Sequence, residues 1–239
     1  MTVVADMVRS RQQSNEAAVR ARVPPLVAVT VATRTGKLAK EQTMSDQITR
    51  IAHALDFAAR KHTHQRRKGT HQEPYVNHLA EVAHLVAEAT GGEDANLVIA
   101  ALLHDCVEDQ GVKAHEIAAL FGEDVANLVM AVTDDKTIDK SLRKQAQVDH
   151  AGAIAPRARI LKIADKTANL KSILHSPPPW PPARKTRYFA WARAVVANAR
   201  GVNAVIDAAF DAEVERAIAA GIAERDFVWH QGLETEGGD

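Results

Sequence analysis

The sequence has few of the features that define several large protein classes. Its 239 residues include one cysteine, Cys106, so no disulfide can form within the chain and a reducing compartment fits. No apolar run approaches the roughly 20 residues that a membrane-spanning helix needs. Residues 1–11 also lack the apolar segment of a secretory signal. We therefore expect a cytoplasmic protein with no membrane partner.

The chain also has no excess of charge of either sign. Its 30 basic and 30 acidic side chains cancel, which argues against a nucleic-acid scaffold and against a polybasic membrane binder. A local basic pocket stays compatible with this balance. The apolar share of 46% is enough for a full hydrophobic core, and the length fits one domain of ordinary size or slightly more.

Residues 1–44 differ in composition from the rest of the chain. They show no sustained hydrophobic period, carry more basic than acidic residues, and include the helix-breaking pair Pro24–Pro25. We interpret them as a disordered extension, or as sequence upstream of a start at Met44; an Arg-rich transit segment is the weaker interpretation. The predicted organisation is this extension, one domain over 45–222, and a tail over 223–239 that frays.

The domain shows the periodicity of amphipathic helices throughout. Ser45 can cap a first helix that runs to about His62. The helix that starts near Asp94 and runs into "LLHDCVED" is apolar on all sides, which predicts a central position in the bundle. No strand pattern, repeat or Gly-rich phosphate loop is evident, so we predict an all-α fold. The other expected helices cover 77–90 (stopped by Gly91–Gly92), 113–121, 122–133, 139–151, 156–174, 183–199 and 202–222.

The central apolar helix leads into an unusual concentration of polar groups. In "AALLHDCVEDQG", His104 and Asp105 follow the apolar run, and Glu108 and Asp109 come four positions after them. If the helix continues, these four side chains form a compact tip, because residues four apart share a helix face. Three carboxylates so close together repel unless a cation or protons neutralise them. The alternative is a histidine that merely pairs with a carboxylate at a frayed helix end.

Two more polar residues stand beside apolar helix faces. His78 begins the second helix, where it would alone be equally compatible with a solvated helix-end histidine. Asp165, within "LKIADKTANL", stands beside a core stripe, where a carboxylate is unusual. An ion pair with Lys162 or Lys166 is the alternative to a metal-binding role for Asp165.

Together these positions give a candidate set of metal ligands. His78, His104, Asp105 and Asp165 offer two imidazole nitrogens and two carboxylates, which suit Mn²⁺, Fe²⁺ or Zn²⁺. We expect Cys106 to be a small core residue rather than a ligand, because no second thiol supports it. The histidines that we assign to exposed positions are His62, His64 and His71.

Several segments resemble one family in their order and spacing. A distant His, a His-Asp pair and a later Asp form the signature of the HD-domain superfamily of metal-dependent phosphohydrolases. The longer segments resemble the hydrolase domain of RelA/SpoT homologues, most of all the Mesh-type small alarmone hydrolases, over roughly residues 46–215. The matching segments are "ALDFAARKHTHQRRKGTHQEPYVNHLAEVAHL", "AALLHDCVED", "FGEDVANLVMAVTDDK", "RKQAQVDHA", "LKIADKTANL" and "RYFAWARAVV".

This resemblance implies an HD-domain helical bundle that removes the 3′-pyrophosphate from the alarmones ppGpp and pppGpp with Mn²⁺, without synthetase activity. The implied metal ligands are His78, His104, Asp105 and Asp165. The implied catalytic residues are Glu108 and Asp109. The positions that match nucleotide-binding residues of the family are Arg67, Lys68, Lys136, Asn169 and Tyr188.

The chain departs from the family pattern at three positions. Gln110 stands where the family usually has Thr, Ala168 where Tyr is frequent, and Leu79 where Pro is common. None of these changes removes an implied ligand or catalytic acid. They bear on the shape of the pocket and on substrate preference.

The chemistry of the residues leaves the individual roles open. Glu108 and Asp109 can take a proton from water and orient it, or can simply balance the charge of a metal. The basic residues 66–68 suit a substrate with several phosphates, or form an ordinary solvated loop. Asn169 can bind a ribose hydroxyl or cap local backbone.

Two other functions stay open beside alarmone hydrolysis. The first is an HD phosphohydrolase that acts on another 2′- or 3′-phosphorylated nucleotide. The second is a catalytically silent alarmone-binding module, although such a module could lose the ligands and acids without consequence. In each case the expected partner is a small nucleotide, and no nucleic acid or membrane is expected.

Overall fold

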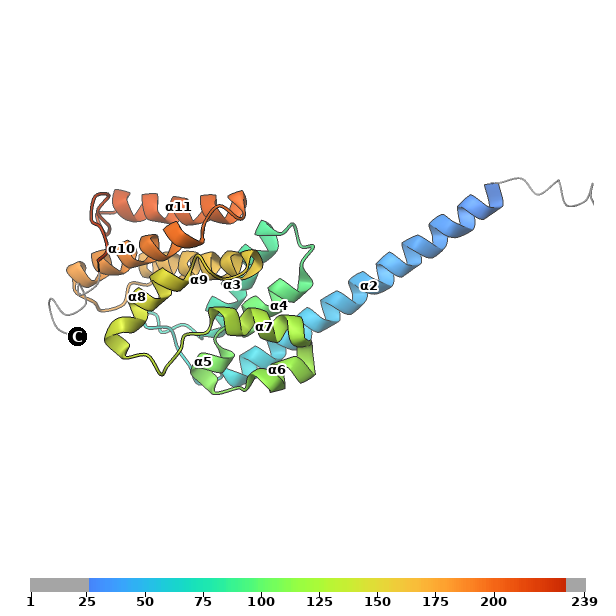
Figure 1. The fold of residues 1–239 in the computed structure, drawn as a ribbon, viewed down its shortest axis with the longest axis horizontal. Coiled ribbons are helices and arrows are strands. Elements are labelled where there is room, and N and C mark those ends of the chain that lie inside the picture. The colour runs from blue at the N-terminus through green and yellow to red at the C-terminus, as the bar shows by residue number, and fades with distance from the viewer. Residues whose placement is uncertain (1–25, 231–239) are drawn as a thin grey trace, which may run out of the picture. The chain divides into compact units, whose positions relative to one another are not determined.

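The computed structural model describes residues 26–230, and within that part of the chain it contains α-helices and no β-strand (Figure 1). The predicted all-α class is therefore confirmed. The chain divides into two units, residues 1–48 and 49–239, and the second holds the helical body. No helix in the described part is long and apolar enough to cross a membrane. The helices are α2 (Leu26–Lys61), α3 (Val76–Ala89), α4 (Ala95–Leu103), α5 (Cys106–Gln110), α6 (Ala114–Phe121), α7 (Glu123–Val132), α8 (Lys140–His150), α9 (Pro156–His175), α10 (Pro182–Ala199) and α11 (Ala204–Ala219).

The first described helix starts earlier than predicted. α2 begins at Leu26, not at Ser45, and the residues between these positions include no proline that would end a helix. Residues 1–25, with Pro24–Pro25, lie outside the described part of the chain, as do residues 231–239. The domain boundaries and the disorder of the extension therefore stay predictions.

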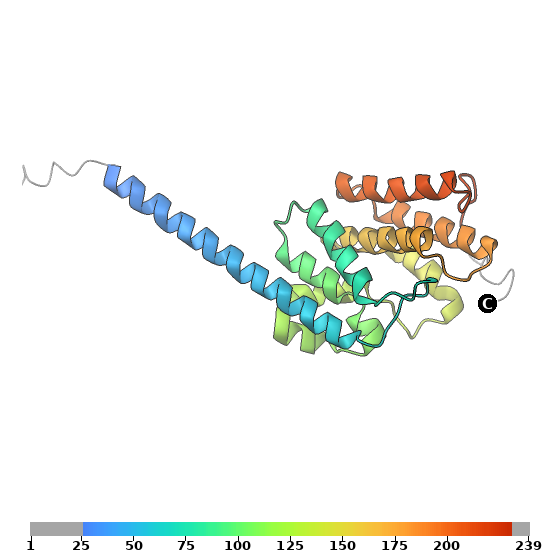
Figure 2. The same ribbon diagram turned by 180° about the vertical axis from the view of Figure 1, so that it is seen from behind.

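Helices α4 and α9 form the centre of the body. Every residue from Leu97 to Leu103 in α4 is buried, which confirms the central position predicted for the apolar helix. α9 packs against α3, α7, α10 and α11. The two opposite views show α7 and α8 on one side of α9 and α3 on the other, with α10 and α11 along its edge (Figures 1 and 2).

The central helix does not continue through the polar stretch. α4 ends at Leu103, and His104 and Asp105 form a turn before α5. The prediction of one continuous helix tip was therefore wrong. Neighbouring side chains on a helix diverge by about 100°, whereas this turn brings Nε2 of His104 within 3.0 Å of Oδ2 of Asp105. Gly111, with φ 67°, then ends α5 in the left-handed conformation that favours glycine.

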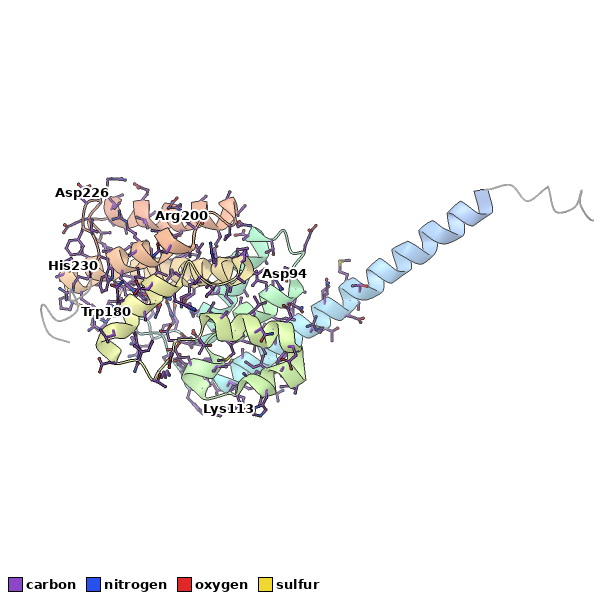
Figure 3. All side chains as sticks on the ribbon, viewed as in Figure 1. Asp94, Lys113, Trp180, Arg200, Asp226 and His230 are labelled. Atoms are coloured by element: carbon purple, nitrogen blue, oxygen red, sulfur yellow. The ribbon has the colours of Figure 1, made fainter. Side chains whose placement is uncertain are left out.

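Two connecting segments border the body at opposite ends. Asp94 caps α4, since its Oδ1 accepts a hydrogen bond from the backbone N–H of Leu97 at 3.0 Å. Trp180 lies in the proline-rich loop between α9 and α10. Figure 3 labels both residues and shows them at opposite ends of the helical body.

Candidate active site

Two histidines and two aspartates, from α3, α9 and the turn between α4 and α5, bring their polar atoms together. Nε2 of His78, in the first turn of α3, lies 3.6 Å from Oδ2 of Asp105 and 3.4 Å from Oδ1 of Asp165 in α9. Nε2 of His104 lies 3.0 Å and 3.8 Å from the same two oxygens. Two ligand atoms that each lie about 2.1 Å from an ion, with a right angle between the two bonds, are about 3.0 Å apart. We call these four residues the donor cluster. Three of them, His78, His104 and Asp165, offer ligand atoms that all lie within 4.8 Å of one another, a spacing compatible with one shared divalent ion.

The hydrogen bonding of His104 leaves one ring nitrogen available to a metal. Its Nδ1 lies 2.8 Å from the backbone carbonyl oxygen of Ala101, so Nδ1 carries the hydrogen and donates it. The ring is 4% exposed, and its Nε2 has no hydrogen-bond partner. A buried ring nitrogen that faces two carboxylates is stabilised by positive charge, which either a proton on the nitrogen or a metal cation between the groups supplies. The donor cluster therefore fits a divalent ion.

The electrostatics of the donor cluster also favour positive charge. Burial opposes protonation of His104, but the carboxylate of Asp105 outweighs burial and raises the pKa of His104 to about 10. Burial likewise opposes ionisation of Asp105, yet His104 holds the pKa of that carboxyl well below its usual range. At Asp165, the ammonium of Lys166 overcomes burial and also holds the carboxyl pKa well below its usual range.

Three neighbouring side chains orient the carboxylates of the cluster. The hydroxyl of Tyr75 donates to Oδ2 of Asp105 at 2.6 Å, and burial raises the pKa of Tyr75 so that its proton is retained. Nδ2 of Asn169 donates to Oδ1 of Asp165 at 2.6 Å, and Nζ of Lys166 donates to its Oδ2 at 3.1 Å. Such outer hydrogen bonds fix the direction of ligand oxygens.

The lysine pairing predicted for Asp165 is present in the structure and is compatible with a metal-binding role. It pairs with Lys166, one of its two predicted lysine partners, and it also faces the histidines of the cluster. The other candidate, Lys162, instead lies with Nζ 3.7 Å from Oδ1 of Asp134. An ion pair with lysine therefore does not displace Asp165 from the donor cluster.

A cavity of about 370 Å³ opens beside the donor cluster, and we call it the inner cavity. Glu108 and Asp109 both line it. Oε2 of Glu108 accepts a hydrogen bond from the backbone N–H of Asp134 at 3.4 Å. Burial, followed by the charge of Asp134, raises the pKa of Glu108. Oδ2 of Asp109 accepts a hydrogen bond from Nε2 of Gln65 at 2.8 Å.

A second cavity, of about 350 Å³, adjoins the first and combines positive charge with aromatic rings. We call it the basic cavity. Nη2 of Arg67 donates to Oδ1 of Asn169 at 3.0 Å, and its guanidinium lies 5.6 Å from the ring centre of Tyr75. The basic and aromatic residues that line the basic cavity are Arg66, Arg67, Lys68, Tyr75, Trp180 and Tyr188. The residues that line both cavities are Lys68, Tyr75, Asp109, Asn169 and Tyr188.

The sequence profile of the HD domain matches residues 54–216 of this chain. The chain belongs to the HD-domain family.

Relatives of known function share most of this HD domain. "Guanosine-3′,5′-bis(diphosphate) 3′-pyrophosphohydrolase MESH1" of Xenopus tropicalis is 41% identical over 169 residues, which cover 70% of this chain and 94% of the relative. The Homo sapiens protein of the same name is 41% identical over 167 residues, which cover 70% of this chain and 93% of the relative. The resemblance to Mesh-type hydrolases is therefore confirmed.

A solved structure is similar to this HD domain in fold as well. It is described as "A metazoan ortholog of SpoT hydrolyzes ppGpp and plays a role in starvation responses". The two chains share 39% sequence identity and superpose with a TM-score of 0.67, over 70% of this chain and 94% of that chain.

One residue predicted to contact the nucleotide lies differently from the others. Lys136 is exposed in the HD domain, and its Nζ donates to the backbone carbonyl oxygen of Glu108. It is not among the described residues that line either cavity. Its role in substrate binding stays a prediction.

Two further residues near the donor cluster, His62 and Cys106, are buried. His62 is 2% exposed, which corrects the prediction of an exposed position; its ring stacks on that of Tyr75 with centroids 5.1 Å apart. The end of α2 directs this side chain inward, whereas His64 and His71 are exposed as expected. Cys106 is buried, also as expected, and burial raises the pKa of its thiol to about 12.

The sequence did not indicate several residues that lie near the donor cluster. Tyr75 stands just before α3 and Trp180 within the proline-rich loop, and neither position has a period or a spacing that predicts a role. Gln65 adjoins the basic run 66–68, which was the only signal near it.

Proposed function

We propose that this chain is a metal-dependent hydrolase that removes the 3′-pyrophosphate from ppGpp and pppGpp, without synthetase activity. The observation that carries the proposal is the continuity of the two cavities. Three members of the donor cluster, His104, Asp105 and Asp165, border the inner cavity together with the acids Glu108 and Asp109. The inner cavity shares lining residues with a basic, aromatic cavity. The names of the MESH1 relatives and the description of the similar solved structure support the same reaction.

The basic cavity suits the nucleoside end of such a substrate. The cations of Arg67 and Lys68 can pair with phosphate oxygens. The rings of Trp180 and Tyr188, whose centroids lie 5.6 Å apart, offer faces for a purine base. Asn169 borders both cavities, with its amide held between Asp165 and Arg67, and the second hydrogen of its NH₂ group can bind a ribose hydroxyl there.

The donor cluster supports Mn²⁺ as the ion. His78, His104, Asp105 and Asp165 would hold it, and mixed imidazole and carboxylate ligands suit Mn²⁺, Fe²⁺ and Zn²⁺; the family resemblance favours Mn²⁺ among these. A divalent ion bound there supplies positive charge to phosphate oxygens and lowers the pKa of water.

Glu108 and Asp109 have different roles toward the attacking water. Glu108 has a raised pKa, which makes it a stronger base than an ordinary glutamate and suits its carboxylate to accept a proton from water. Asp109 is held by Gln65 at the junction of the two cavities, where it can orient that water. Attack of the water oxygen on the nearer phosphorus of the 3′-diphosphate breaks the bond between that phosphorus and the 3′ oxygen. The water oxygen leaves on pyrophosphate, and the proton taken up from the water is returned to the 3′ oxygen to give a 3′-hydroxyl.

The biological setting follows from the substrate. Removal of ppGpp would end an alarmone signal of the stringent type. The lone buried Cys106 is compatible with the reducing conditions of the cytoplasm, which we propose as the compartment. The balanced charge of the chain supports a small nucleotide as the partner rather than a nucleic acid.

The direct test is identification of the products from ppGpp. We expect the purified protein with Mn²⁺ to yield GDP and pyrophosphate, resolved by anion-exchange chromatography and phosphorus NMR. Chelation should stop the reaction, and added Mn²⁺ should restore it. Release of orthophosphate alone, or turnover of another phosphorylated nucleotide in a panel but not of ppGpp, would indicate a different phosphohydrolase. Binding of ppGpp with no turnover would indicate a non-catalytic module.

A further inference from the structure

We propose that Gln65 is a positioning residue for Asp109 and that the buried ring of His62 holds Gln65 in place. The inference rests on the proposed function, because it concerns the catalytic carboxylate assigned there. It assigns roles to two residues that lie outside the predicted site. The proposed catalytic acids remain Glu108 and Asp109.

The amide of Gln65 connects the protein interior to Asp109. Its Nε2 donates to Oδ2 of Asp109 at 2.8 Å. Its Oε1 lies 2.5 Å from Nδ1 of His62 and receives a second hydrogen bond from Nε2 of Gln110 at 2.6 Å. Each polar end of the Gln65 amide therefore has a partner.

The chemistry of these partners determines the direction of every hydrogen bond. A carboxylate has no hydrogen to give, so the NH₂ end of the amide must face Asp109. Oε1 also has no hydrogen, so Nδ1 of His62 must carry one. The other nitrogen of the His62 ring, Nε2, lies 3.6 Å from Sγ of Cys106, which can donate to it. The donors run from Cys106 through His62 and Gln65 to Asp109.

This chain of hydrogen bonds links a rigid group to an exposed one. His62 is 2% exposed, and its ring lies nearly parallel to Tyr75 at an angle of 14°. Asp109 is exposed, so its carboxylate would otherwise be free to rotate. The hydroxyl of Tyr75 holds the metal-ligand candidate Asp105 at 2.6 Å. The same stacked pair of rings thus supports both the donor cluster and Asp109.

Gln110 supplies a second hydrogen-bond donor to Gln65. It stands where the family usually has Thr, and its longer side chain reaches Oε1 of Gln65 at 2.6 Å. A threonine side chain is shorter by two bonds. The second donor to Gln65 therefore depends on this departure from the family pattern.

The decisive measurement is the turnover number of variants that remove one hydrogen bond at a time. Gln65→Leu removes the donor to Asp109, and we expect kcat to fall by about 10–100-fold, as is typical for the loss of such an outer contact. The metal content should stay near the wild-type value, because the donor cluster loses no ligand. Gln65 lines the basic cavity but carries no charge, so any rise in KM should be smaller than the fall in kcat. A wild-type kcat, or loss of bound metal, would overturn the proposal.

A matched pair of variants at position 62 tests the role of the ring nitrogen. His62→Phe keeps a ring on Tyr75 but has no hydrogen-bond donor, so kcat should fall as in Gln65→Leu. His62→Asn places an amide nitrogen close to the position of Nδ1 and should retain most of the activity. A purely structural role predicts the reverse order, because the larger ring preserves the packing. Equal kcat values, or a less active Asn variant, would overturn the inference.

A double-variant cycle then tests whether Gln65 acts through Asp109. In an Asp109→Ala background, Gln65→Leu should cause no further loss of single-turnover rate, because the group that it positions is gone. Independent, multiplying losses would overturn the proposal. A crystal structure of Gln65→Leu supplies a readout without turnover: the Asp109 carboxylate should leave its wild-type orientation.

These experiments distinguish failure of the positioning role of Gln65 from failure of the proposed hydrolase function. If the wild-type protein does not hydrolyse ppGpp, the proposed function fails. If the wild-type protein is active and Gln65→Leu is equally active, only the positioning role fails.

Discussion

Nε2 of His78 and Oδ1 of Asp165 lie 3.4 Å apart, although they belong to different helices, α3 and α9. The apolar faces of the two helices bring them together. Leu79 and Val82 in α3 and Ile163 in α9 are fully buried, and the two helices pack along these faces. A polar pair is thus held at one end of an apolar contact, where an ion can share the two atoms.

Replacement of Asp165 by alanine should abolish the retention of metal. The change removes one carboxylate ligand and leaves two histidines whose nitrogens are buried beside Asp105. We expect the affinity for Mn²⁺ to fall by more than the roughly 10–100-fold that is typical for outer residues. Elemental analysis after desalting measures the metal content, and Glu93→Ala, at an exposed position, is the matched control. Undiminished metal in Asp165→Ala would remove this residue from the donor cluster.

Replacement of Glu108 by glutamine should separate metal binding from turnover. The amide is close in size to the carboxylate but cannot accept a proton from water, so kcat should fall by about 10²–10⁴-fold. The metal content should not change, because Glu108 is outside the donor cluster. Normal turnover of ppGpp by this variant would leave Glu108 only the role of balancing charge.

The local patterns of the sequence predicted most of the helices and marked the four members of the donor cluster as candidate ligands. The helix predicted over 156–174 is observed as Pro156–His175, because its apolar period and its flanking prolines act locally. The break between α4 and α5 was not predictable in this way, since neither His104 nor Asp105 is a helix breaker.

The supporting residues were not predictable because their roles arise from distant pairs. Tyr75 holds Asp105 across a separation of 30 residues, and Gln65 holds Asp109 across 44. No spacing within one helix encodes such a contact. His62 was assigned to the surface for the same reason, since only the packing of Tyr75 over its ring shows that it is buried.

The pH dependence of turnover should respond to Asp134. Burial, followed by the charge of Asp134, raises the pKa of Glu108 above its usual 4.5. A general base works when deprotonated, so activity should fall as the pH drops through this raised pKa. Asp134→Asn removes the repelling charge and lowers the pKa, and the acid limb of kcat/KM should therefore move to lower pH.

The neighbouring Asp135 provides a matched control for this pH shift. It is exposed, and its carboxylate accepts a hydrogen bond from the backbone N–H of Thr137 at 2.8 Å. Asp135→Asn should leave the acid limb in place. An unmoved acid limb in Asp134→Asn, measured over the same pH range, would show that Glu108 does not limit the rate there.

Replacement of Gly69 by alanine should weaken substrate binding. Gly69 is buried directly after Lys68, and a Cβ at this position would collide with the backbone oxygen and the side chain of Ser176. The loop must shift to relieve the collision, and the shift would carry Arg67 and Lys68 away from the basic cavity. We expect KM for ppGpp to rise several-fold, with little change in metal content. Thr70→Ala, at the exposed next position, should leave KM unchanged, and an equal KM in both variants would contradict this role of the loop.

Replacement of Asp94 by alanine should lower stability without affecting catalysis. Its Oδ1 caps α4 through the N–H of Leu97 at 3.0 Å, and its two oxygens accept hydrogen bonds from Nε and Nη2 of Arg157 at 2.7 and 2.8 Å. Loss of the cap typically costs about 1 kcal/mol, and loss of a partly exposed ion pair adds up to about 1 kcal/mol. The free energy of unfolding, measured in urea, should therefore fall by about 1–2 kcal/mol.

The activity of the Asp94 variants provides the contrast. Asp94 and Trp180, which lines the basic cavity, lie at opposite ends of the helical body (Figure 3), so kcat and KM should stay at wild-type values below the unfolding transition. Asp94→Asn keeps an oxygen that can cap α4 but loses the charge that pairs with Arg157, so its stability should lie between those of the wild type and Asp94→Ala. A variant at this position that lowered kcat while folded would show that the α4 N-terminus is coupled to the donor cluster at the other end of the same helix.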